Sequence, residues 1–308
     1  MKGELIALAA LAMFATNIIV TRLASSRLSL DAGYVIAVSV NVVGAALMLA
    51  VERLFVSTPI AWDWPGTFYF ALGGIFSTYF GRWFMLESIA RLGPSRASAF
   101  QVSSPLFTLA IAWLFLGERL SIDALVAMAI AGAGLLLVSL SRPSVAPKAS
   151  AGSHSASKWQ RLVQSGFLLG SGASAAYAVS NVFRGAGIRQ WNEAITGVLI
   201  GSIAGFAMQL VLGKNLRTVF QGIRTARNRD GILLFVATGV LTICAQVCVI
   251  LAMARSPVAV VSLITLCTPV LVFPLSYFVL KNEEKINART IIGALLIIAG
   301  IGAILARD

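Results

Sequence analysis

The chain has 308 residues, of which 58% are hydrophobic and only 12% are charged. A soluble domain carries roughly 25% charged residues, so no water-soluble fold could bury this much apolar surface, and lipid must surround most of the chain. The formal net charge is +12. Because the basic residues lie between apolar runs, we assign this charge to membrane topology and anionic lipid headgroups, and we expect no nucleic-acid partner.

Ten apolar runs follow one another along the chain, each of about 20 residues, the length that spans a bilayer as a helix. The first five lie at 4–22, 32–51, 67–91, 94–116 and 122–140. Residues 142–161 are rich in Ser, Ala, Pro and Lys and form a predicted flexible linker. The second five runs lie at 163–183, 194–212, 231–254, 257–280 and 288–306. Helices are expected because every backbone polar group must be hydrogen-bonded within hydrocarbon.

The two sets of five runs resemble each other in sequence. Similar residues recur in the same order: Asn17 and Asn181, Ala90-Arg91 and Ala254-Arg255, Pro94 and Pro257, Ser104-Pro105 and Thr268-Pro269, and Ala131-Gly132-Ala133-Gly134 and Ala299-Gly300-Ile301-Gly302. An odd number of spans in each copy makes the second copy enter the membrane from the opposite side. We therefore predict an all-α membrane protein with two inverted five-helix repeats, residues 1–141 and 162–308, which meet near the middle of the membrane.

The basic residues also predict the orientation of the chain. The odd-numbered connections carry 15 Lys and Arg residues, and the even-numbered connections and the termini carry 7. The positive-inside rule places the odd connections in the cytoplasm and both termini outside. Within 213–230 the spacing of apolar and basic residues fits either a short amphipathic helix on the membrane surface or a solvated basic loop.

Few ionisable residues lie inside the predicted spans, and such residues are costly in hydrocarbon unless they have a function or a partner. Arg82, near the middle of the third span, is predicted to bind an anionic group such as a carboxylate. The structural alternative pairs Arg82 with a backbone carbonyl or with Glu87. The other predicted substrate contacts are polar or aromatic residues within spans: Asn17, Tyr79, Trp83 (or Trp113 as the apolar wall), Gln101, Tyr177, Asn181 and Gln246.

Few residues bear on the predictions of energy coupling and of helix hinges. A buried Glu87 could exchange protons with a raised pKa, but its position near the end of its span and Arg91 one turn later favour a structural role. We therefore lean toward a facilitator or a weakly coupled exporter. Pro105 and Pro269 interrupt their spans and serve either as hinges or as static kinks.

The stretch LGPSRASAFQVSSPLFTLAIAWLFLGERLS, residues 92–121, resembles the signature of EamA-type transporters of the drug/metabolite transporter superfamily. In the second repeat, Asn282-Glu283-Glu284 stands where Gly117-Glu118-Arg119 would be expected. The resemblance implies ten helices around a central cavity, alternating access, and export of amino acids, apolar and aromatic ones included, or of other metabolites. It implies a multi-pass protein of a bacterial inner membrane. Fold alone does not fix the substrate.

Other function classes fit less well. The sequence has no P-loop, no H-E-x-x-H, no G-x-S-x-G and no histidine within a span, so we expect neither an ATP-driven pump nor an enzyme, and no metal or other cofactor. The main alternative is a flippase or carrier for lipid-linked sugars, nucleotide sugars or drug-like molecules. The expected partners are a small-molecule substrate and membrane lipids, with the chain as a monomer or homodimer.

Overall fold

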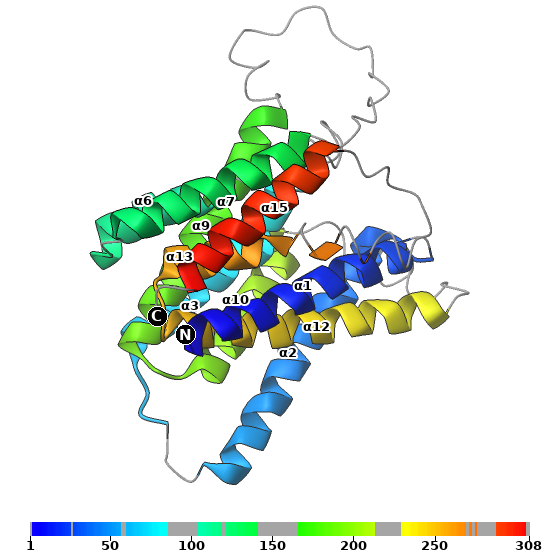
Figure 1. Cartoon of the computed structure of the whole chain (residues 1–308). Coiled ribbons are helices and arrows are strands. Elements are labelled where there is room, and N and C mark those ends of the chain that lie inside the picture. The colour runs from blue at the N-terminus through cyan, green and yellow to red at the C-terminus, as the bar shows by residue number, and fades with distance from the viewer. Residues whose placement is uncertain are drawn as a thin grey trace, which may run out of the picture.

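The computed structural model describes residues 2–25, 27–56, 60–85, 104–118, 121–140, 166–212, 229–268, 271–272, 275 and 288–305. Within these ranges every regular element is a helix, and each of the ten predicted spans contains one (Figure 1). The first repeat contains α1 (Lys2–Ser25), α2 (Leu30–Phe55), α3 (Trp64–Gly74) with the π-helix η1 (Ile75–Gly81), α6 (Ser104–Leu116) and α7 (Ile122–Leu140). The second contains α9 (Gly166–Gln190), α10 (Ala194–Leu212), α12 (Arg229–Met253), α13 (Val258–Leu266) and α15 (Ala288–Leu305).

The helices present apolar side chains to their surroundings, as expected for a protein in lipid. Leu54 and Phe55 on α2 and Phe115 on α6 expose 81%, 82% and 73% of their surface. Four described helices are each long and apolar enough to cross a membrane alone: Gly3–Thr21, Ala32–Phe55, Ala194–Leu212 and Arg229–Met253. These long apolar helices and their outward apolar side chains confirm the prediction of an all-α membrane protein.

Helix packing follows the internal repeat. α1 packs along α12, and the counterpart of α1 in the second repeat, α9, packs along α3 and η1. α2 contacts α12 just as α10 contacts α3, and α6 contacts α9 just as α13 contacts α1. The remaining major pairs, α2 with α10, α6 with α13 and α7 with α15, join counterparts to each other. Exchanging each helix for its counterpart therefore leaves these main pairs unchanged, as expected for a pseudo-two-fold axis.

The direction of the helices shows that the repeats are inverted. A Cβ on Gly3, at the start of α1, would lie 2.1 Å from Ser256 Oγ after the end of α12. A Cβ on Gly231, at the start of α12, would lie 3.2 Å from the Cβ of Leu28 after the end of α1. α1 and α12 are thus antiparallel, although the first and third helices of directly repeated units would run parallel. The predicted inverted arrangement is confirmed, and α1 begins and α15 ends on the same side of the view in Figure 1.

Glycine allows the backbones of α3 and α10 to touch. A Cβ on Gly74 would lie 2.0 Å from the carbonyl oxygen of Gly201, an atom that cannot move aside without moving the whole helix. Likewise, a Cβ on Gly134 in α7 would lie 2.6 Å from the carbonyl oxygen of Gly293 in α15. Without hydrophobic gain from leaving lipid, membrane helices associate through such close van der Waals contact.

The largest buried apolar cluster begins at one end of the helices and reaches Ile243 in the middle of α12. It includes Phe70 from α3, Ile188 and Trp191 around the end of α9, and Met253 and Val258 around the α12–α13 turn. We call the end of the molecule at the α9–α10 connection, residues 191–193, the packed end. It positions the helices that carry the polar residues described next.

Candidate functional site

The π-helix η1 leads directly into Arg82, the residue that the sequence predicts as the anion-binding group. The guanidinium carbon of Arg82 lies 3.9 Å from the centroid of the Tyr34 ring, which comes from α2. The backbone N–H of Arg82 donates to the carbonyl of Tyr79, and the Thr78 carbonyl accepts the Tyr34 hydroxyl at 2.6 Å. Single π-helical turns are rare and frequent at functional sites, because they re-aim side chains and release backbone groups. Here the π-helix places Arg82 over an aromatic face, a favourable cation–π arrangement.

Arg82 has no counter-charge within the described part of the chain. No hydrogen bond or ion pair of its side chain is found there, and its Nε is buried without a partner. Nη1 and Nη2 are not among the fully buried unpaired atoms. The guanidinium therefore keeps its outer amino groups available, and the alternative of a clamp to a carbonyl is absent from the described residues.

Arg184 is a second cation in the same region, and the sequence analysis placed it wrongly. The predicted span 163–183 ended one residue before it, but α9 continues to Gln190. The Arg184 Nη2 donates to Ser77 Oγ at 2.8 Å and to Gln246 Oε1 at 3.0 Å. Arg184 thus ties α9 to η1 and α12. The spacing of the residues could have revealed this position. Tyr177, Asn181 and Arg184 follow one another at intervals of four and three, which places them on one face of a helix.

Tyr177 connects the two arginines. A Cβ on Gly81 would lie 3.0 Å from the Tyr177 ring, so this ring packs directly beside the residue before Arg82. Tyr177 lies near enough to Arg82 and to Arg184 to interact electrostatically with both. Two guanidinium groups, one from each repeat, therefore lie around one phenol.

The two predicted asparagines hold neighbouring helices together. Asn181 donates to Ser262 Oγ on α13 at 3.0 Å, and Ser262 shares a hydrogen bond of 3.3 Å with Thr108 on α6. Asn17 donates to Thr242 Oγ1 on α12 at 3.0 Å. Thr242 lies one turn before Gln246 on α12, and Gln246 accepts a hydrogen bond from Arg184. The Asn17 and Arg184 contacts therefore lie on the same face of α12.

Of the other predicted residues, Tyr79 borders this group, near enough to Tyr34 to interact with it electrostatically. The Tyr79 hydroxyl lies 3.4 Å from the carbonyl oxygen of Leu212, at the end of α10. Trp83 is 48% exposed and packs on Phe84, and Trp113 is 60% exposed. Pro105 is buried as the second residue of α6. Residues outside the described ranges are Glu87, Gln101 and Pro269.

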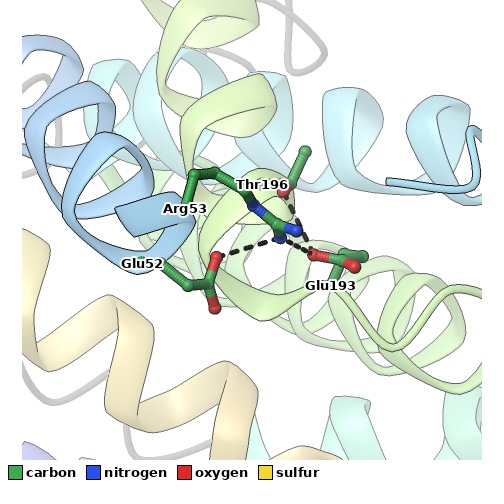
Figure 2. Close-up of polar contacts among 4 residues, drawn as sticks. All are labelled: Glu52, Arg53, Glu193 and Thr196. Carbon is green, nitrogen blue, oxygen red and sulfur yellow. Dashed lines mark hydrogen bonds and ion pairs between the residues drawn. The ribbon is translucent and has the colours of Figure 1, made fainter. Parts of the chain in front are cut away.

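Charged side chains connect the repeats at the packed end. Figure 2 shows Arg53, at the end of α2, between Glu193 at 2.8 Å and Glu52 at 3.1 Å, with Thr196 donating to Glu193 at 3.4 Å.

Two more carboxylates are buried at this end. Glu118 forms an ion pair with Arg189 and accepts the backbone N–H of Val258 at 2.9 Å, and Glu4 accepts the hydroxyl of Ser256. Each of these contacts joins an element of one repeat to an element of the other.

Comparison with sequence families decides what kind of protein carries this arrangement. Residues 1–140 and 164–306 match the EamA-like transporter family, which together is nearly the whole chain. The chain belongs to the EamA-like transporter family. It is therefore a multi-pass membrane protein that transports small molecules, and the resemblance read from residues 92–121 is confirmed.

A solved structure shares the fold of this EamA-like chain. It is titled "Crystal structure of protein", aligns with a TM-score of 0.69 at 18% identity, and the alignment covers 99% of this chain and 98% of the other. At this identity the likeness shows the fold alone. No curated protein matches the sequence. The substrate of this EamA-like transporter must therefore be argued from its own residues.

Proposed function

We propose that this transporter is a secondary exporter of small metabolites that carry an anionic group, amino acids included, and that it works by alternating access in a bacterial inner membrane. The observation that carries the proposal is Arg82, a guanidinium within the third span that stacks on Tyr34 and has no carboxylate partner among the described residues. A charge in this position is expensive, and by default it marks a substrate pathway. A bound anion would neutralise it through charge-assisted hydrogen bonds.

Alternating access is supported by the contrast between the packed end and the polar middle. Apolar side chains fill the packed end, and ion pairs such as Arg53–Glu193 join the repeats there. Ion pairs and hydrogen bonds can break and re-form as two rigid repeats rock against each other, and close apolar packing excludes water while that end is closed. The packed end thus has the properties of a closed gate, and Arg82 lies behind it.

The alternative substrate class is a lipid-linked sugar, a nucleotide sugar or a drug-like molecule. A guanidinium binds phosphate as well as carboxylate, so Arg82 suits a phosphorylated substrate too. Transport of free amino acids by the purified protein separates the two classes.

The test is counterflow in liposomes with Arg82→Gln against the parent protein, using amino acids, nucleosides and lipid-linked sugars. We expect Arg82→Gln to abolish transport while the protein inserts and elutes as a single species, because glutamine keeps hydrogen bonding and loses the charge. Arg255→Gln, at an exposed position in the α12–α13 turn, is the matched charge-removal control and should transport like the parent. Unchanged uptake by Arg82→Gln would remove this residue from the site.

A further inference from the structure

We propose that Arg184 is a second anion-binding residue, and that the substrate is a small solute with two anionic groups, one for each guanidinium. The inference rests on the proposed function, because it concerns the same site around Arg82. The relevant observation is the balance of charge around Tyr177: two guanidinium groups and, among the described residues, no carboxylate that pairs with either.

The groups that contact the two arginines are all neutral. Arg184 has Ser77 and Gln246, and Arg82 has the face of Tyr34. Neutral partners satisfy hydrogen bonds but leave the charge, and an uncompensated buried charge costs several kcal/mol in effective terms. Two such cations in one site therefore favour a ligand that brings two negative charges.

Arg184 also has N–H groups that no described residue accepts. The Nη2 amino group makes both protein contacts. Nε and Nη1 make none within the described chain, and neither is among its fully buried unpaired atoms. These N–H groups are therefore unpaired but not fully buried, and the same holds for Nη1 and Nη2 of Arg82. Each guanidinium thus keeps N–H groups that no described residue binds and that an anionic ligand can use.

The internal repeat shows that this arrangement is specific. Arg82 and Gln246 occupy equivalent positions, and so do Arg184 and Val20. If the repeats were identical, an Arg in one repeat would have an Arg at the equivalent position of the other. Instead the first repeat supplies only Arg82 and the second supplies only Arg184. A solute with two anionic groups therefore binds both repeats at once, across the interface that must rearrange during transport.

The structural alternative is that Arg184 only holds α9 against η1 and α12. In that case, replacing it would affect all substrates alike. Selectivity separates the two roles, because an anion-binding residue acts only on the substrate group that it binds.

The experiment measures competition in liposome counterflow with pairs whose members differ in one anionic group: succinate against butyrate, and glutamate against glutamine. We expect the parent protein to favour each acidic member by roughly tenfold or more, the factor that about 1.4 kcal/mol supplies. Arg184→Gln should reduce these ratios to near unity. Arg255→Gln should keep them.

Gln246→Glu is a second variant that keeps the side-chain shape. The new carboxylate would sit 3.0 Å from Arg184, where the amide oxygen lies now, and would neutralise this cation from within. We expect the same loss of preference for the acidic member of each pair, although the Arg184 side chain is still present.

The outcomes distinguish this inference from the proposed function. Transport of butyrate or glutamine with no preference for their acidic counterparts would overturn the two-charge substrate and leave Arg82 as the anion site. An equal loss for every substrate in Arg184→Gln, with unchanged ratios in Gln246→Glu, would also overturn it. Absence of transport for every solute in the parent protein would instead overturn the proposed function itself.

Discussion

The ion pair between Arg53 and Glu193 should hold the packed end closed. Arg53 lies at the end of α2 in the first repeat, and Glu193 lies in the α9–α10 connection of the second. Their contact of 2.8 Å must break if the repeats separate at this end. Replacing Glu193 with Gln keeps the size of the side chain and removes its charge. We expect Glu193→Gln to increase the population that is open at this end.

The size of the effect follows from the geometry. At 2.8 Å and an effective dielectric constant of about 20, the Coulomb energy is about 6 kcal/mol before desolvation. Both side chains are 25% exposed, so water screens the pair, and side-chain ordering offsets much of the rest. Arg53 also keeps Glu52 at 3.1 Å. A net loss of about 1 kcal/mol remains, which changes the ratio of closed to open states by about fivefold.

Accessibility of a cysteine measures this ratio. Cys244, Cys248 and Cys267 would first be replaced, and a single cysteine placed at position 181, in the polar middle of α9. A membrane-impermeant maleimide, added on the side of the α9–α10 connection, should label the Glu193→Gln background about five times faster than the parent.

A double-mutant cycle supplies the control. Arg53→Gln should produce a similar increase, and the double variant should add little to either single change, because both remove the same contact. Equal labelling of all four backgrounds would refute the reasoning that this pair closes the transporter.

Three further predictions concern packing, orientation and coupling. Gly74→Ala should lower the unfolding free energy in detergent by about 1–3 kcal/mol, because the new methyl group meets the Gly201 backbone. Gly132→Ala is the control and should not destabilise the protein, because a Cβ there has nothing within 4 Å. Equal melting temperatures for the two variants would contradict the close α3–α10 contact. A reporter fused after Asp308 should report the non-cytoplasmic side, as the excess of basic residues in odd connections requires; cytoplasmic activity would reverse the orientation. Counterflow should change little under an imposed pH gradient, and strict dependence on the gradient would restore proton coupling through Glu87.

Much of the architecture could be read from the sequence because it depends on composition and on order along the chain. Apolar runs separated by polar connections specify spans whatever their neighbours are, since the solvent is lipid. The duplicated residue pairs specify an inverted repeat, since five spans per copy reverse the direction of entry. Arg82 could be found because a charge amid an apolar run stands out. The helix packing is consistent with each of these readings.

The partners of these residues could not be read in the same way. Hydropathy ended the sixth span at residue 183, because the charge of Arg184 lowers the average hydropathy there, although α9 continues to Gln190. Tyr34 gave no signal, because an aromatic residue near the start of a span is typical of the membrane interface. Glu193 and Arg53 lie in different repeats, 140 residues apart.

The sequence by itself thus determined the solvent, the number of spans, the inversion and one cation. The tertiary structure alone decided that a second cation lies near the same phenol, that neutral groups contact it, and that ion pairs join the two repeats at one end. The physical reason is that lipid burial and duplication act on each segment separately. The meeting of two side chains depends instead on the register and rotation of helices against each other, including the shift that a single π-helical turn introduces before Arg82.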